Sequence, residues 1–132
     1  MIVAGIGCRR GAPAPDVEAA IRAALAHAGV PAHALDAVAT IAAKQNEAGI
    51  EATAKKFGVT IVPVSDPELK AAGERGRTRS ERVLALMGVP SVAEAAALAA
   101  AGPTARLIAP RLAVGSATCA LAASEAAQGT AP

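Results

Sequence analysis

The chain has 132 residues and a formal net charge of +2. This length suits one domain with its own hydrophobic core, and the small charge excess is far from the basic clustering of proteins that bind a phosphate backbone. Aromatic residues make up only 1% of the sequence, so it lacks the stacking platforms that hold single-stranded nucleic acid. We therefore expect no nucleic-acid partner.

The compartment follows from the first residues and the cysteines. Residues 1–5 lack the charged start and the apolar length of a signal peptide, and Cys8 and Cys119 lie far apart in the sequence. We expect a cytoplasmic protein with reduced thiols. The most apolar stretch, residues 107–123, contains proline, arginine and glycine, so no membrane span is expected. The two histidines have no ligand spacing to Cys, Asp or Glu, so no metal is predicted, and no cofactor is expected.

In chain order, a β-branched run at residues 1–6 predicts a buried first strand. A helix follows, with Pro15 in its first turn and apolar residues at helical spacing until Gly29. Residues 35–41 predict the second strand, and the helix after it ends at Gly58.

Residues 59–64 predict a third strand, and Pro63 indicates an edge strand or the end of the strand because proline cannot donate to a ladder. A short helix opens at Asp66-Pro67 and reaches the segment 73–79, which is rich in glycine and arginine. That segment predicts a mobile basic loop, whose arginines are either solvated or folded over a bound anion.

Two capping boxes, each a hydroxyl followed three residues later by a carboxylate, predict helices over residues 79–87 and 92–101. The boxes pair Thr78 with Glu81 and Ser91 with Glu94. Residues 105–109 and 116–122 predict the last two strands. Because only a few residues join them, these strands should form an antiparallel hairpin.

This order of elements predicts an α/β fold. We expect a three-layer α/β/α sandwich with a mixed, mostly parallel sheet of about five strands and a C-terminal antiparallel hairpin. Residues 1–125 should form a single domain, and residues 126–132 a frayed tail.

Glycines and arginines join the first strand to the first helix in the segment 5–11, Gly-Ile-Gly-Cys-Arg-Arg-Gly. In an α/β sheet this loop lies at the carboxyl edge, where loop and helix N–H groups meet ligands. Gly5 and Gly7 allow close backbone approach, while Arg9 and Arg10 suit carboxylates or phosphates. The segment matches neither a dinucleotide fingerprint nor a P-loop. The alternative is a plain glycine turn with solvated arginines.

Other strand ends add polar residues to the same edge. Lys44 and Glu47 follow the second strand, Ser65 follows the third, and Arg111 follows the fourth. Lys44 can pair with an anion, while Glu47 can act as an acid or base or place negative charge at a helix start. Together with the two arginines of the first loop, Lys44 and Arg111 predict an anionic ligand.

Cys8 is a candidate nucleophile, because adjacent guanidinium groups and a helix N-terminus would lower the pKa of its thiol. Neither His27 nor His33 has an evident route to it, so the alternative is a small packing residue. Cys8 and Glu47 are the candidates for catalysis, and no catalytic residue is assigned.

Four segments resemble the CobE family, which is similar to the C-terminal domain of CbiG proteins. They are residues 5–11, 44–49 (Lys-Gln-Asn-Glu-Ala-Gly), 88–98 (Gly-Val-Pro-Ser-Val-Ala-Glu-Ala-Ala-Ala-Leu) and 107–111 (Leu-Ile-Ala-Pro-Arg). The likeness extends from Ile2 to about Ala123. Two positions depart from the pattern: Arg111 stands where the family usually has lysine, and residues 113–118 only loosely match its last strand, so no role is carried over to Thr118.

The resemblance implies cobalamin (vitamin B12) biosynthesis by the aerobic route. The leading interpretation is a non-enzymatic protein that binds or carries a corrinoid or precorrin intermediate, with other enzymes of the pathway as further partners. CbiG proteins open a lactone of a cobalt-precorrin, so a hydrolase acting on a precorrin lactone through Glu47 or Cys8 is the alternative. A phosphate- or nucleotide-binding module is a third reading.

Overall fold

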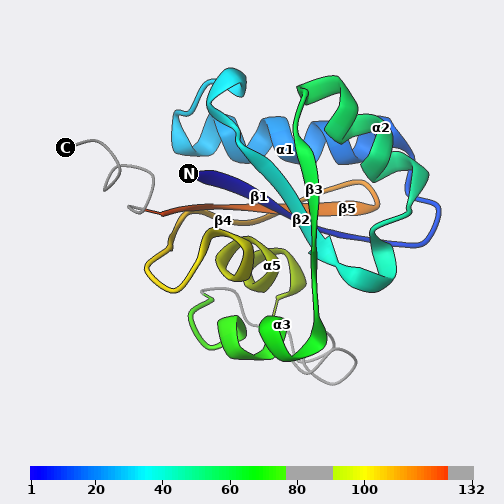
Figure 1. Cartoon of the computed structure of the whole chain (residues 1–132). Coiled ribbons are helices and arrows are strands. Elements are labelled where there is room, and N and C mark those ends of the chain that lie inside the picture. The colour runs from blue at the N-terminus through cyan, green and yellow to red at the C-terminus, as the bar shows by residue number, and fades with distance from the viewer. Residues whose placement is uncertain (77–90, 125–132) are drawn as a thin grey trace.

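The computed structural model describes residues 1–76 and 91–124 (Figure 1). The helix predicted over residues 79–87, with its Thr78–Glu81 capping box, lies outside the described residues, as does the predicted tail, residues 126–132. The described elements, in chain order, are β1 (Ile2–Cys8), α1 (Ala14–Ala28), a 3-10 turn (Ala32–Ala34), β2 (Ala37–Ile41), a 3-10 turn (Ala42–Lys44), α2 (Ala48–Phe57), β3 (Thr60–Val64), α3 (Asp66–Gly73), α5 (Val92–Ala101), β4 (Arg106–Val114) and β5 (Ala117–Ala123).

The five strands form one sheet in the order β3-β2-β1-β5-β4. Strands β1, β2 and β3 are parallel, and β5 lies antiparallel between β1 and β4. Since β4 is antiparallel to β5, it points the same way as β1. The mixed, mostly parallel sheet and its C-terminal antiparallel hairpin are therefore confirmed, and Pro63 lies in the edge strand β3, as predicted.

Helices cover both faces of the sheet, so the three-layer arrangement is confirmed. Helices α1 and α2 lie on one face, and α3 and α5 lie on the other (Figure 1). The first core contains Ile6, Ile21 and Leu121, and the second contains Leu69 and Leu98. Alanines fill most of the remaining core positions, which lets the layers approach closely without aromatic side chains.

Local sequence accounts for the ends of the helices. Gly29 and Gly58 end α1 and α2 in the left-handed region, with φ of 68° and 71°, where a side chain would be strained. Helix α3 begins at Ser65 with a capping box to Glu68. At the start of α5, the Ser91 hydroxyl accepts a hydrogen bond from the Glu94 backbone N–H at 3.3 Å.

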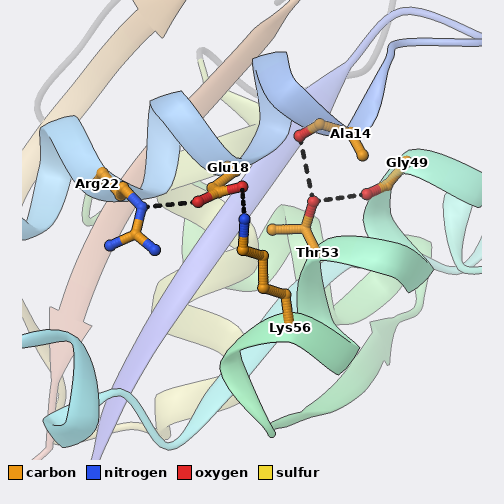
Figure 2. A network of polar contacts seen from close by, with 6 residues as sticks. All are labelled: Ala14, Glu18, Arg22, Gly49, Thr53 and Lys56. Atoms are coloured by element: carbon orange, nitrogen blue, oxygen red, sulfur yellow. Dashed lines mark hydrogen bonds and ion pairs between the residues drawn. The ribbon is translucent and has the colours of Figure 1, made fainter.

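Glu18 on α1 pairs with Arg22 of the same helix and with Lys56 of α2, and the second pair joins the two helices (Figure 2). Its carboxylate accepts hydrogen bonds from Arg22 Nε at 2.8 Å and from Lys56 Nζ at 2.9 Å. The Arg22 guanidinium also lies 5.0 Å from the centre of the Phe57 ring, within the range of a cation–π contact. Hydrogen bonds from both cations lower the pKa of the Glu18 carboxyl.

A second contact brings the start of α2 directly against the start of α1. The Thr53 hydroxyl donates to the carbonyl oxygens of Gly49 (2.7 Å) and Ala14 (3.3 Å), as Figure 2 shows. A Cβ atom at Gly49 would overlap the carbonyl oxygen of Ala12. Glycine is required here because the backbones of the two helix starts touch, and this places the loop after β2 beside the loop after β1.

Residues 73–79 were predicted to form a mobile basic loop, and this prediction is wrong for the first part of the segment. Gly73 is the last residue of α3, and Arg75 is held by hydrogen bonds. Its guanidinium donates, at 3.1 to 3.5 Å, to four carbonyl oxygens at the end of α5 and just beyond it, those of Leu98, Gly102, Pro103 and Ala105. A cation suits the negative end of a helix dipole, and the packing of α3 on α5 brings Arg75 there. Arg77 and Arg79 lie outside the described residues.

Among the helices of residues 1–76 and 91–124, none combines the length and the apolar character that crossing a membrane requires.

Candidate functional site

The ends of four strands meet at one edge of the sheet, which we call the carboxyl edge. Because β1, β2 and β3 are parallel, the residues after them, Arg9 and Arg10, Lys44, and Ser65, lie along this edge in that strand order. The turn between β4 and β5 lies there too, since Cys8 at the end of β1 pairs with Ala117 at the start of β5. The loops after β1, β2 and β3 therefore lie at one edge, as predicted.

Arg111 does not follow the fourth strand, as predicted, but lies inside it. Strand β4 continues to Val114, with a bulge before Leu112. Ala109 pairs with Leu121 and Leu112 with Cys119, so between these pairs β4 has one residue more than β5, and the register also shifts between Leu107 and Ala109. Pro110 does not end the strand, because a bulge in an edge strand tolerates a residue without an N–H group. Arg111 therefore sits three residues before the end of β4.

The loop after β1 is fastened at two points by its backbone. Arg9 N–H donates to the carbonyl oxygen of Ser116 in the β4–β5 turn at 3.1 Å. Gly11 N–H donates to Glu47 Oε1 at 2.8 Å, and Gly11 has a φ of 76°, which favours glycine. Arg9 and Arg10 lie between these points, and both are exposed. The loop thus presents two guanidinium groups from a held backbone.

Asp16, in the first turn of α1, holds the β4–β5 turn. Its Oδ2 accepts hydrogen bonds from Ser116 N–H at 2.9 Å and from the Ser116 hydroxyl at 2.7 Å. The backbone bond and then the hydroxyl bond lower the pKa of the Asp16 carboxyl. Since Ser116 also accepts the Arg9 N–H, Asp16 indirectly supports the loop after β1.

Cys8 is half-buried, and the pKa of its thiol is shifted in the opposite direction to the prediction. Burial raises the pKa of the Cys8 thiol, Lys44 lowers it and Glu47 raises it, with burial the largest cause. The net direction is upward, so the predicted activation was wrong. The neighbouring guanidinium groups are exposed to solvent, and the acting charges come from the loop after β2. Cys119 is fully buried, and burial raises its pKa strongly.

Gly5 serves packing rather than ligand contact. It is buried, and a Cβ atom there would overlap the carbonyl oxygen of Ala93 and lie 2.6 Å from Ala97 N. The glycine lets α5 lie directly on β1, so the predicted approach of a ligand to Gly5 is blocked by the helix. At Gly7, the Thr118 hydroxyl donates to the Gly7 carbonyl oxygen at 3.1 Å.

Ser65 is engaged in starting α3. Its hydroxyl donates to Glu68 Oε1 at 2.8 Å and accepts from Glu68 N–H at 3.3 Å. Hydrogen bonds from the Ser65 backbone and hydroxyl lower the pKa of the Glu68 carboxyl. Both functions of the hydroxyl are thus used by the capping box.

The cations of the carboxyl edge have no carboxylate partner among residues 1–76 and 91–124. Both ion pairs in this part of the chain are made by Glu18, with Arg22 and Lys56. Two carboxylates at the edge accept hydrogen bonds from backbone N–H groups, Asp16 from Ser116 and Glu47 from Gly11. Glu94 on α5 accepts the Arg111 N–H. The charged donors of Arg9, Arg10 and Lys44 at the edge therefore remain available to an anion, as does the guanidinium of Arg111 inside β4. In the same residues no group of three or more Cys, His, Asp or Glu side chains could hold a metal ion.

Comparison with known proteins identifies the family. Residues 2–122 match the family model described as "Cobalamin synthesis G C-terminus". The chain is also 40% identical over 121 residues to a protein of Sinorhizobium sp named Protein CobE, covering 92% of this chain and 79% of that one. The chain belongs to the CobE/CbiG C-terminal family. It is a protein of cobalamin biosynthesis, as the resemblance implied.

Solved structures of CobE/CbiG proteins share the fold. The crystal structure of CobE, described as a protein from the cobalamin (vitamin B12) biosynthetic pathway, superposes with a TM-score of 0.85 at 34% identity, covering 92% of this chain and 89% of that one. The cobalamin biosynthesis protein chiG from Agrobacterium tumefaciens has a TM-score of 0.73 at 45% identity, covering 94% and 98%. A putative cobalamin biosynthesis protein G homologue from Sulfolobus solfataricus, 21% identical, matches in fold over 36% of its length (TM-score 0.67).

Sequence reasoning missed the contact made by Glu94 in this CobE/CbiG domain. The capping box assigned its carboxylate to Ser91, but Oε2 accepts the Arg111 N–H at 3.0 Å, and Glu94 is 0% exposed. A clue was present, because Glu94 is the only charged residue in the apolar helix α5. A lone carboxylate in such a helix is buried with it and must find a donor.

Proposed function

We propose that this protein binds and carries a corrinoid or precorrin intermediate of aerobic cobalamin biosynthesis in the cytoplasm, without chemical turnover. The observation that carries the proposal is the row of cations along the carboxyl edge that have no carboxylate partner among the described residues. Corrinoid intermediates are flat rings whose rims bear carboxylates. Guanidinium and ammonium groups are strong donors to such carboxylates.

The backbone of the loop after β1 is held by hydrogen bonds, which favours ligand binding by its arginines over a role as solvated surface charges. Arg9 and Arg10 lie on a loop fastened through Ser116 and Glu47, so less conformational freedom is lost when they contact a ligand. The hydrogen bond from Gly11 N–H to Glu47 joins the loops after β1 and β2, and Lys44 in the second loop lowers the pKa of the Cys8 thiol at the end of β1. These two loops form the core of the proposed site.

Neither of the two candidates for catalysis, Cys8 and Glu47, is in a state that favours turnover. The Cys8 thiol has a raised pKa, which makes its thiolate scarce near neutral pH. Glu47 already accepts the Gly11 N–H, which gives its carboxylate a positioning task. A hydrolase that opens a precorrin lactone through either group is the competing function, and release of acetaldehyde from a lactone substrate would establish it.

The test is retention of pigment. The protein is mixed at low-micromolar concentration with hydrogenobyrinic acid, a corrinoid whose rim carries free carboxylates, and is then gel-filtered. We expect the pigment to elute with the protein, and the methyl ester of the same corrinoid, which lacks rim charge, to separate from it. Recovery of colourless protein from the acid would contradict the proposal.

Handover of the bound intermediate to other enzymes of the pathway is part of the same proposal. Nucleotides are the competing ligands, because an anion site built from arginine and lysine also suits phosphate. A bound ligand raises the melting temperature by mass action. We expect the corrinoid acid to raise Tm, and NADP and ATP to leave it unchanged; a shift with a nucleotide alone would favour the nucleotide-binding function.

A further inference from the structure

The bulge in β4 is held from outside the sheet by Glu94. Pro110 has no N–H group, and the N–H of Arg111 donates to Glu94 Oε2 on α5 at 3.0 Å. Bulges bend a strand and change the direction of its side chains, and they are frequent beside functional sites. The carboxylate of Glu94 therefore fixes the peptide that carries the Arg111 side chain.

The hydrogen bond between Glu94 and the Arg111 N–H is shielded from water, because Glu94 is buried. Glu94 is 0% exposed, and a Cβ atom at Gly76 would lie 2.8 Å from its Oε1, so the chain after α3 passes closely over the carboxylate. A buried carboxylate is costly unless it is hydrogen-bonded, and a bond from a backbone N–H to a carboxylate is stronger in a dry environment. Apolar residues surround this position on α5, where an alanine would pack without that cost.

The position of Arg111 extends the proposed site across the sheet. Lys44 follows β2, and Arg111 lies in β4; β1 and β5 lie between these strands. Three strand spacings correspond to about 14 Å. A broad, flat polycarboxylate spans this separation directly, whereas a small anion such as phosphate would require both side chains to extend toward each other across β1 and β5.

We propose that Glu94 is a positioning residue that holds Arg111 as a second anchoring point, so that the ligand is a rigid polycarboxylate bound from the end of β2 to β4. This inference rests on the proposed function, because it assigns a role to Arg111 in the same site. It adds that binding depends on a residue, Glu94, that does not itself touch the ligand.

The experiment is a double-mutant cycle with the full chain. The affinity for hydrogenobyrinic acid is measured by equilibrium dialysis in wild type, Glu94→Asp, Arg111→Ala and the double variant. Aspartate keeps the charge of Glu94 but is one methylene too short to hold the Arg111 N–H. We expect Arg111→Ala to weaken binding about tenfold and Glu94→Asp about fivefold, with no further loss when Glu94→Asp is added to Arg111→Ala.

Two further variants separate positioning from charge and from general stability. Glu94→Gln keeps the length and a carbonyl acceptor, so its affinity should stay near that of wild type; a gain in affinity would show that Glu94 acts only through its charge. Asp36 is the matched control, because its Oδ2 accepts the Ile2 N–H at 2.7 Å at the opposite edge of the sheet. Asp36→Ala should leave binding unchanged, and circular dichroism confirms folding of each variant.

The outcomes distinguish the two proposals. If wild type does not retain the corrinoid acid, the proposed function fails and the role of Arg111 fails with it. If wild type binds but Arg111→Ala binds equally well, or Glu94→Asp weakens binding equally with and without Arg111, the positioning role is overturned while the proposed function stands. If Glu94→Asp does not fold, a loss of affinity in folded Glu94→Gln equal to that of Arg111→Ala overturns it.

Discussion

The cations between α1 and α2 and the cations of the carboxyl edge belong to the same residue types but differ in their partners. Arg22 and Lys56 both bind Glu18, and Arg22 also lies over Phe57 (Figure 2). Arg9 and Lys44 have no carboxylate partner among the described residues. The first pair contributes to the docking of two helices, whereas the second pair keeps its donors for something outside the chain.

The two groups of cations differ because the carboxylates near them have different hydrogen-bond partners. Glu18 offers both of its oxygens to cations, but Asp16, Glu47 and Glu94 each accept a backbone N–H from a neighbouring segment. Each of these three lies at or near the start of a helix. A balanced count of charges therefore says little about a site until the partner of each carboxylate is known.

The largest expected effect comes from removing cations of the edge. Arg9→Ala combined with Lys44→Ala should weaken binding of the corrinoid acid roughly 100-fold, because two charged contacts are lost. Arg22→Ala combined with Lys56→Ala is the matched control with the same charge change and should not alter affinity. Equilibrium dialysis measures both, and equal weakening in the two double variants would remove the distinction between the regions.

A smaller effect is expected at Glu47, whose carboxylate holds the loop of Arg9 and Arg10 through Gly11. Glu47→Ala should weaken binding about tenfold because the loop loses this contact, while Glu47→Gln retains an acceptor and most of the affinity. Acetaldehyde release from a precorrin lactone that Glu47→Gln abolishes would instead make Glu47 a catalytic residue.

The rate at which Cys8 is alkylated depends on the pKa of its thiol, and so reports the effect of Lys44 and Glu47 on that thiol. Its raised pKa predicts slower reaction with iodoacetamide at pH 7.5 than a free thiol shows. Because Glu47 raises this pKa and Lys44 lowers it, Glu47→Gln should accelerate alkylation about twofold and Lys44→Ala should slow it by a similar factor. Mass spectrometry of the modified peptide reads the rate, and identical rates in all three proteins would place both charges away from the thiol.

Glu18→Ala should have only a small effect, on stability alone. Its two ion pairs are largely exposed, so we expect Tm to fall by about one to three degrees. The difference from wild type should shrink further in 1 M NaCl, because salt screens exposed pairs. Binding of the corrinoid acid should be unchanged; a loss of affinity would connect α1 and α2 to the site.

The smallest effect is the pH dependence of Asp16. Its pKa is lowered from the ordinary value of 3.8, so its hydrogen bonds to Ser116 stabilise the fold fully above that value and are lost as the pH falls through the lowered pKa. Asp16→Asn should therefore be less stable than wild type at pH 6, and the difference should narrow below about pH 4. Urea unfolding at several pH values tests this, and a difference that widens toward acid would have the wrong sign.

Much of the fold could be predicted because its determinants are local. Pro15, Gly29 and Gly58 mark the ends of helices through backbone conformations that hold in any surroundings. The position of Pro63 in an edge strand follows from its missing N–H group. The gathering of Arg9, Lys44 and Ser65 at one edge follows in turn from the parallel order of three strands.

The remaining features depended on contacts between segments distant in the sequence. Arg111 lies inside β4 because a bulge accommodates Pro110, and Arg75 reaches the end of α5 because α3 packs against that helix. Gly5 is covered because α5 lies on β1 at that point. No spacing rule gives these contacts, since each depends on how closely two elements approach.

Most of the elements, their parallel order and the edge where charged residues collect follow from local sequence, because hydrophobic period and turn chemistry act over a few residues. Three features depend on how the elements pack: which carboxylates accept backbone N–H groups, how deeply Cys8 and Glu94 are buried, and which cations remain for a ligand. Burial and hydrogen-bond partners are properties of packing, and packing joins residues that the sequence keeps far apart.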